Sequence, residues 1–269
     1  MNSNIGILGC GWLGLPLAST MVKNKYSVHG STTSQDKIEA LKEKGITPYL
    51  IKLSENGITG DIDGFLTDID ILIINIPPRL RRDPKENYVK RITHLHKAII
   101  VTKIRTIIFI SSTSVYGDLQ GTVTEDTQPQ PNTESGRQLF ETEAIFKENK
   151  DLNTTIIRFG GLIGPNRHPA KFLSGKKDLT NGMDPVNLIH LNDCIGLIRT
   201  VIEKKHSNIL INGVYPLHPT KEEYYTSEAR KIDVVPPTFL PSNHLKSSKI
   251  IENSPKTVKI YQYHTSIIS

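Results

Sequence analysis

The chain has 269 residues, of which 37% are hydrophobic and 22% are charged. These values are ordinary for a globular protein and exclude the charge-rich, apolar-poor composition of a disordered chain. The formal net charge of +6 is a mild excess, and the basic residues are spread along the chain rather than gathered with aromatic residues, so we expect no nucleic-acid partner.

The number of cysteines and the length of the apolar runs indicate whether to expect a metal site or a membrane helix. The two cysteines, Cys10 and Cys194, are too few for the paired clusters of a structural zinc site, and the sequence has no HExxH motif, so we expect no metal site. The longest aliphatic run, from Ile69 to Ile76, is interrupted by Asp70 and is far shorter than the roughly 20 residues of a membrane helix. The sequence therefore predicts a cytoplasmic protein with no membrane partner.

The first half of the chain alternates short β-branched runs with amphipathic helical stretches. In chain order we expect a strand at 5–8, a helix at 12–23, a strand at 26–31, a helix at 35–44, strands at 48–51 and 70–76, a helix at 87–102, a strand at 105–110, a helix at 135–149 and a strand at 154–158. This alternation is typical of βαβ units with helices on both faces of a parallel sheet. It predicts an α/β fold with a Rossmann-type doubly wound parallel sheet.

The second half is less regular. Its expected elements are a polar stretch at 165–184, a helix that begins near 192, an apolar run at 208–211, a helix near 220–231 and an irregular, proline-containing segment at 234–255. We expect residues 1–164, completed by about 186–215, to form a dinucleotide-binding domain. Residues 165–185 and 216–269 would then form a small C-terminal substrate-binding lobe.

A GxGxxG motif lies directly after the first predicted strand and at the start of the first predicted helix. In this position the first glycine permits a tight turn, the second lets the backbone approach a pyrophosphate, and the third allows close helix packing. The helix N-terminus adds free N–H groups and a positive dipole. The motif therefore predicts a dinucleotide site that includes Gly9, Gly11, Trp12, Leu13 and Gly14.

The end of the second predicted strand bears on the choice of dinucleotide. An acidic residue about 20 residues after the motif usually holds the ribose 2′-hydroxyl of NAD. Here the strand runs instead into Ser31, Thr32 and Thr33. A loop of hydroxyl groups accepts a 2′-phosphate without charge repulsion, so we expect NADP in preference to NAD. A simple turn leading into the next helix is an equally good interpretation of these residues.

Three further segments carry motifs: SSTSVYG from Ser111, RFGGLIGP from Arg158 and NLIHLND from Asn187. The first places hydroxyl groups at the carboxyl end of a central strand, where ligands bind in open α/β sheets. Together with the glycine motif, these segments resemble the extended short-chain dehydrogenase/reductase family, which includes the NAD-dependent epimerase/dehydratases of nucleotide sugars. The resemblance covers essentially the whole chain.

The resemblance implies roles for particular residues. It makes Ser112 the catalytic serine and Thr113 a substrate contact. Further cofactor contacts that it implies are Asn75, Ile76 and Pro77 at the ribose, Ser111, and the backbone of Phe159, Gly160 and Gly161 at the nicotinamide carboxamide. It also places Arg167, His168 and Lys171 where the family's substrate lobe begins, so these side chains are candidates to hold a phosphate or a sugar acid.

The sequence departs from the family at the proton donor, which is a tyrosine with a lysine four residues later. The corresponding residues here are Ser135 and Leu139. A serine hydroxyl is a much weaker acid than a phenol and leucine carries no charge, so the usual proton relay is missing. We expect Ser135 to cap the predicted helix, with Leu139 on its inward face. We expect Tyr116 to pack in the sheet rather than to act as a substitute acid.

The residues and the resemblance together favour an NAD(P)-binding oxidoreductase or epimerase that acts on a sugar-like or nucleotide-linked alcohol or carbonyl. Ser112 would polarise the substrate oxygen. The alternative is a catalytically silent dinucleotide-binding sensor or scaffold protein, which the missing tyrosine and lysine favour. The expected partner is a small-molecule substrate such as a nucleotide sugar, and the expected assembly is a monomer or a homodimer.

Overall fold

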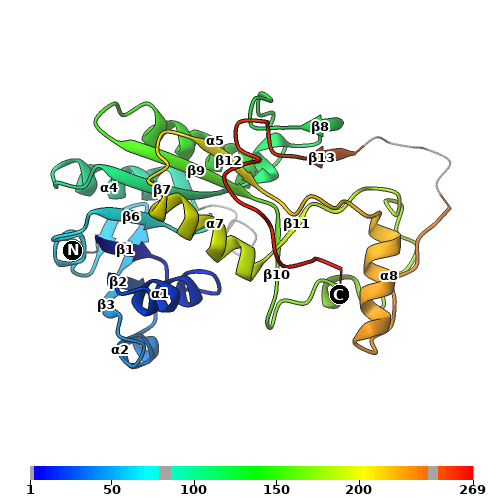
Figure 1. Ribbon diagram of the computed structural model, residues 1–269, viewed down its shortest axis with the longest axis horizontal. Helices are drawn as coiled ribbons and strands as arrows, with labels where there is room; N and C mark the ends of the chain where they lie inside the picture. The colour runs from blue at the N-terminus through cyan, green and yellow to red at the C-terminus, as the bar shows by residue number, and fades with distance from the viewer. Residues whose placement is uncertain (1–2, 79–85, 242–247, 269) are drawn as a thin grey trace.

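A seven-stranded sheet forms the centre of the computed structural model, which describes residues 3–78, 86–241 and 248–268 (Figure 1). Its strands lie in the order β12-β9-β7-β6-β1-β2-β3, and every neighbouring pair is parallel. In chain order they are β1 (Asn4–Leu8), β2 (Ser27–Thr32), β3 (Thr47–Leu50), β6 (Ile71–Ile74), β7 (Thr106–Ser112), β9 (Asn153–Phe159) and β12 (Leu210–Gly213). The strand order reverses between β1 and β6, which makes that pair the topological switch point of the sheet.

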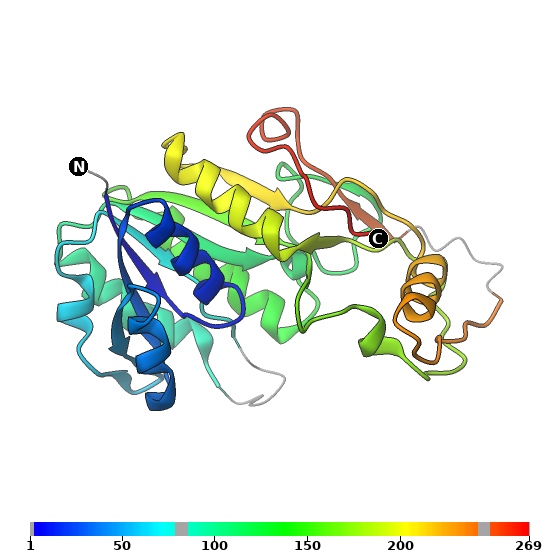
Figure 2. The same cartoon turned by 60° about the horizontal axis from the view of Figure 1, so that its bottom comes forward.

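Helices cover both faces of this sheet, because alternate side chains of each strand point to opposite faces. On one face, α1 (Gly14–Lys23) and α7 (Leu191–Glu203) pack against Ile5, Ile7 and Ile73. Figure 2 shows these two helices, in blue and yellow, on the same side of the sheet. On the other face, α4 (Tyr88–Ile100) and α5 (Glu134–Lys147) pack against Leu72 and Ile74. The Rossmann-type doubly wound fold predicted from the sequence is therefore confirmed.

The predicted elements match the structure in their centres and differ at their ends. The expected helix at 35–44 is a 3-10 turn (Gln35–Lys37) followed by the short α2 (Ile38–Lys42), and the helix expected from 12 begins at Gly14. The N-cap expected at Ser135 is wrong. Thr133 caps α5 instead, because its Oγ1 accepts a 3.1 Å hydrogen bond from Gly136 N. Ser135 lies in the first turn of the helix.

Several short elements show no sequence periodicity, and the sequence analysis did not predict them. They are β4 (Lys52–Ser54), β5 (Gly57–Thr59), α3 (Ile62–Leu66), a 3-10 turn (Thr113–Tyr116), β8 (Gly121–Val123), β10 (Gly161–Ile163), α6 (Ala170–Leu173), β11 (Leu188–His190) and β13 (Lys249–Ile251). Three to five residues span barely one helical turn or two strand repeats, so hydrophobic patterning cannot reveal such elements.

The C-terminal part of the chain first lies away from the central sheet and then packs against α7. Helix α8 (Lys221–Lys231) lies away from the central sheet in both views and packs against α6 (Figure 1, Figure 2). Strand β13 then pairs with β8, and the last residues are fastened to α7. There Asp193 accepts hydrogen bonds from the Tyr261 hydroxyl at 2.8 Å and from His264 N at 3.0 Å. No helix in the described ranges is long and apolar enough to cross a membrane.

Candidate functional site

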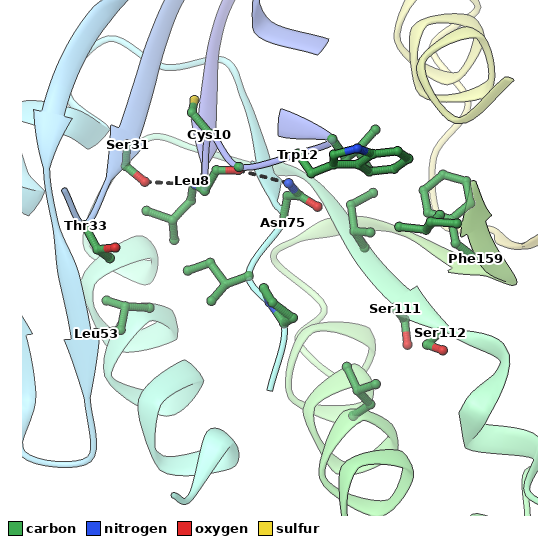
Figure 3. Close-up of a pocket in the computed structure, with 18 of the residues that line it drawn as sticks. Leu8, Cys10, Trp12, Ser31, Thr33, Leu53, Asn75, Ser111, Ser112 and Phe159 are labelled. Atoms are coloured by element: carbon green, nitrogen blue, oxygen red, sulfur yellow. Dashed lines mark hydrogen bonds between the residues drawn. The ribbon is translucent and has the colours of Figure 1, made fainter. Parts of the chain in front are cut away.

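A cavity of about 970 Å³ opens at the carboxyl ends of the central strands (Figure 3). Its walls include the residues that follow β1 and β6, the two strands at the switch point of the sheet. In Figure 3, Thr33 and Leu53 lie on one side of this site and Ser111, Ser112 and Phe159 on the other, with Asn75 between them. The fold therefore gathers most of the predicted site residues around one cavity.

The three glycines of the GxGxxG motif have different physical roles. Gly9 has a φ of +106°, and a Cβ atom there would lie 2.5 Å from Asn75 O. A Cβ atom on Gly14 would lie 2.1 Å from Gly9 O. A Cβ atom on Gly11 would meet nothing within 4 Å, although Gly11 lines the cavity. The protein's own packing thus requires Gly9 and Gly14, whereas Gly11 keeps open a space of the kind that a pyrophosphate needs at a helix N-terminus.

Two side chains hold the glycine turn in place. Ser31 Oγ accepts a 2.9 Å hydrogen bond from Gly9 N, and Asn75 Nδ2 donates a 2.9 Å hydrogen bond to Gly9 O (Figure 3). Thr32 is buried, and its Oγ1 accepts from Ser34 N at 3.2 Å. Thr33 is exposed at the cavity. Ser31 and Asn75 therefore shape the turn, and Thr33 is the hydroxyl of this loop that is placed to meet a ligand.

Two lysines border the cavity together with Thr33, and the sequence analysis did not place them in the site. Lys37 lies in the 3-10 turn after β2, and Lys52 begins β4. Both side chains are exposed. They give this end of the cavity a positive charge that the hydroxyl-rich sequence alone did not indicate.

The two serines at the end of β7 differ in whether the proton of their hydroxyl group is already donated within the protein. Ser111 is buried, and its hydroxyl donates to Glu143 Oε1 at 2.5 Å. Ser112 Oγ accepts from Ser114 N at 3.1 Å, an arrangement that leaves the Ser112 proton able to donate to a ligand. Both serines line the cavity, as does Thr113, which is buried. Ser112 is thus the better placed of the two serines to act on a bound molecule.

Tyr116, which was considered as a substitute proton donor, does not line this cavity. Tyr116 is fully buried, its hydroxyl donates to Asn212 Oδ1 at 3.0 Å, and Arg158 lies 4.8 Å above its ring. Burial raises the pKa of Tyr116, with Arg158 opposing the shift. Leu139, on α5, lines the cavity with an apolar side chain. Tyr116 is therefore packed in the protein interior as expected, but it lies in the 3-10 turn after β7 and not in the sheet itself.

The segment after β9 contacts the cavity through Phe159, which lies beside Trp12 in Figure 3. The two following N–H groups are already engaged within the protein. Gly160 N donates to Gly213 O at 3.0 Å, and Gly161 N donates to Asn187 O at 2.8 Å. Any backbone contact of these two glycines with a cofactor therefore has to use their carbonyl groups.

The structure separates the three basic residues predicted for the substrate. Arg167 lines the cavity at the glycine turn, where its guanidinium carbon lies 5.2 Å above the ring of Trp12. Trp12 Nε1 donates to Pro165 O at 2.9 Å and so fixes this contact. His168 faces α8, with its Nε2 3.5 Å from Glu228 Oε2. Neither His168 nor Lys171 borders the cavity.

A second cavity of about 1040 Å³ adjoins the first, and Lys249 borders both. Lys249 begins β13, is half-buried, and donates from Nζ to Gly117 O. Burial lowers the pKa of Lys249, while Asp118 acts in the opposite direction. Lys249 was not predicted, because it lies 137 positions after Ser112 in a segment without a sequence pattern.

In the described part of the chain, no cluster of histidine, cysteine and acidic side chains is suited to a metal.

Comparisons with known proteins agree with this geometry. Residues 4–78 match the model of the NAD binding domain of 6-phosphogluconate dehydrogenase. Protein YeeZ of Escherichia coli K12 is 38% identical over 252 residues, covering 93% of this chain and 91% of YeeZ. The "Uncharacterized UDP-glucose epimerase YtcB" of Bacillus subtilis 168 is 24% identical over 224 residues, covering 73% of this chain and 71% of YtcB. The structure of UDP-glucuronic acid 4-epimerase from Bacillus cereus in complex with NAD superposes with a TM-score of 0.78 at 18% identity, covering 98% of this chain and 93% of that one.

Proposed function

The chain belongs to the extended short-chain dehydrogenase/reductase family, and we propose that it is an NAD(P)-dependent oxidoreductase or epimerase acting on a nucleotide sugar. One observation carries the proposal: the same cavity is bordered by the open Gly11 turn and by the available hydroxyl of Ser112. The similarity to YtcB and to the Bacillus cereus enzyme supports the substrate class, since the first is named a UDP-glucose epimerase and the second is a UDP-glucuronic acid 4-epimerase.

The cofactor contacts follow from the walls of the first cavity. The α1 N-terminus and the Gly11 turn would hold the diphosphate, and Arg167 lies close enough to the turn to add a positive charge there. We therefore assign Arg167 to the cofactor rather than to the substrate. Thr33, Lys37 and Lys52 support a preference for NADP, because they offer a hydroxyl and two cations to a 2′-phosphate.

The second cavity is the proposed place for the nucleotide part of the substrate. It joins the first at Lys249, so the diphosphate of a nucleotide sugar could lie beside this lysine while the sugar reaches Ser112. This arrangement supports the substrate lobe proposed from the sequence for residues 165–185 and 216–269, except that the last residues, which include Tyr261 and His264, are fastened to α7 on the central sheet. Residues such as Asn181, Lys221 and Tyr225, which line the second cavity, come from those ranges.

The chain's own residues bind and orient the reactants in this proposal. NAD(P), held at the Gly11 turn, would supply hydride transfer between an alcohol carbon and a carbonyl carbon, with the accompanying proton exchanged with solvent. Ser112 donates a hydrogen bond to the substrate oxygen and stabilises the negative charge that develops there. Leu139 and Phe159 form apolar parts of the wall and exclude water from the reacting carbon.

The test is a calorimetric titration with NADPH and NADH, followed by nicotinamide absorbance and product analysis with UDP-glucose and UDP-glucuronic acid. We expect binding of the cofactor and conversion of a UDP-sugar. The Ser112→Ala variant is expected to keep its cofactor affinity and to lose turnover. Equal loss of both in this variant would show that Ser112 only shapes the cavity.

A silent sensor or scaffold is the second candidate, and Leu139 is the observation that favours it. With Leu139 and Ser135 at the positions of the family's lysine and tyrosine, the wall of the cavity lacks the family's proton relay. Tight cofactor binding without conversion of any UDP-sugar or simple aldehyde would favour this candidate. Failure to bind either nicotinamide cofactor would contradict both.

A further inference from the structure

Arg91 is a buried cation on the wall of the first cavity. It lies on α4, and the residue is only 6% exposed. The other described cations that line this cavity are Lys37, Lys52 and Arg167, which are exposed, and Lys249, which is half-buried. Arginine is almost never buried this deeply unless its N–H groups have partners.

The described partners of Arg91 do not satisfy its guanidinium. Nη1 lies 2.9 Å from Glu86 Oε1, which also lines the cavity, and the guanidinium carbon lies 5.7 Å from the ring centre of Tyr88. Nε is buried and has no hydrogen-bond partner among the described residues. A buried N–H without an acceptor is costly, so this group requires an explanation.

The position of Arg91 in the helix argues against packing as that explanation. The buried face of α4 consists of Tyr88, Ile92, Leu95 and Ile99 together with Arg91, so an apolar residue would complete it. A charged residue on such a face is the sequence signal that could have marked Arg91, and the sequence analysis did not use it. The position favours a role toward the cavity.

The neighbouring helix α5 contributes an apolar part of the same cavity wall. Tyr88 N donates to Gln138 Oε1 at 2.6 Å, which fastens the start of α4 to α5 next to Leu139. Leu139 lines the same cavity with an apolar side chain. Glu86 and Arg91 are therefore available to provide the polar contacts that Leu139 cannot make.

We propose that Arg91 and Glu86 together bind a ribose diol of the dinucleotide, an inference that rests on the proposed function. A hydroxyl group both accepts and donates, so it can accept from Arg91 Nε and donate to the Glu86 carboxylate. A phosphate fits less well, because Glu86 already neutralises the guanidinium and would repel a second anion. Both riboses of NAD carry a diol, whereas in NADP only the nicotinamide ribose does, because the 2′-hydroxyl of its adenosine ribose is phosphorylated; the choice of probes separates the two riboses.

The experiment measures the affinities of the wild type and of three variants for NADH, ADP-ribose and ADP. Arg91→Gln removes the charge, Arg91→Lys keeps the charge but removes Nε–H, and Glu86→Gln keeps an acceptor but removes its charge. Arg137→Gln is the matched control, since Arg137 is an exposed, ion-paired residue of α5 that does not line the cavity. Thermal unfolding of each variant reports on the fold, and the conservative Arg91→Lys keeps the test usable should Arg91→Gln fail to fold.

Both Arg91 variants are expected to bind NADH about tenfold to a hundredfold more weakly, the value of a lost charge-assisted hydrogen bond. The Glu86→Gln variant should lose less, because an amide oxygen is a weaker acceptor than a carboxylate. A parallel loss for ADP would place the diol at the adenosine ribose. A loss for ADP-ribose and NADH alone would place it at the second ribose.

Unchanged affinities in folded Arg91 variants would overturn this inference and leave the proposed function standing, because Arg91 would then be a structural ion pair only. Absence of binding by the wild type would overturn both. Equal weakening in the Arg137→Gln control would also contradict the inference, since that residue is remote from the ligand in this arrangement.

Discussion

The Ser111 hydroxyl lies 2.5 Å from Glu143 Oε1, and that carboxylate also accepts from Arg158 Nη2 at 2.6 Å. All three side chains are buried, and they join β7, β9 and α5 beneath the wall of the cavity. This network fixes the strand end that presents Ser112. It also engages Ser111, so the two adjacent serines have different roles.

Glu143→Gln is expected to destabilise the protein strongly. The neutral amide leaves the buried Arg158 without a counter-charge, and breaking a buried pair in this way costs about 3–5 kcal/mol. Glu141→Gln on the same helix is the control, because Glu141 is exposed, and its solvent-screened pair with Arg137 contributes little to stability. Urea denaturation of both variants measures the difference. Equal free energies of unfolding would contradict a structural role for the network.

Substitution at Gly11 is expected to impair cofactor binding but not folding, whereas substitution at Gly14 is expected to impair folding. Gly11→Leu should fold with a melting temperature close to that of the wild type, because a Cβ there meets nothing within 4 Å, and it should abolish NADPH and NADH binding by filling the cavity. Gly14→Ala should instead destabilise the fold, because its Cβ would lie 2.1 Å from Gly9 O. Thermal unfolding and calorimetric titration separate the two effects. Undiminished binding by Gly11→Leu would refute the dinucleotide site.

The lysines beside Thr33 are expected to determine cofactor preference. Lys37→Ala and Lys52→Ala should each weaken NADPH binding by severalfold, an effect of up to about 1 kcal/mol at an exposed site, and should change NADH binding less. Added salt should reduce the difference, because exposed charges are screened. Lys42→Ala on α2 is the control, since Lys42 pairs with Glu39 and does not line the cavity. Equal losses for both cofactors would contradict a 2′-phosphate site.

The sequence was informative wherever local patterning determines structure. The GxGxxG motif and the apolar strands predicted the fold and the turn at Gly9–Gly14, since their requirements lie within a few residues. The expected cap at Ser135 was wrong because Thr133 starts the helix two positions earlier by accepting from Gly136 N, and both residue types are good caps. Which of the two residues caps the helix depends on the path of the chain before the helix begins.

Residues brought to the site by tertiary structure were harder to predict. Lys249 reaches the cavity only because β13 pairs with β8, a contact between segments more than 120 residues apart. His168 and Lys171 were predicted together with Arg167 because the resemblance places this short segment at the start of the family's substrate lobe, yet the chain turns His168 toward Glu228 on α8. Proximity in sequence gives no direction to a side chain in an irregular segment, so only Arg167 of the three reaches the cavity.

Binding of a nucleoside diphosphate is expected to weaken at alkaline pH through Lys249. Burial lowers the pKa of this lysine from its usual value of 10.5, so its charge is lost at a lower pH than for an exposed lysine. Affinity for UDP should therefore fall as the pH rises through that lowered pKa, in a range where the phosphate groups are already ionised. Lys249→Met should bind UDP more weakly at neutral pH and should show no such decline. Lys256→Met, which changes an exposed lysine, should retain the wild-type profile. A decline that persists in Lys249→Met would assign the titration to another group and remove Lys249 from the substrate site.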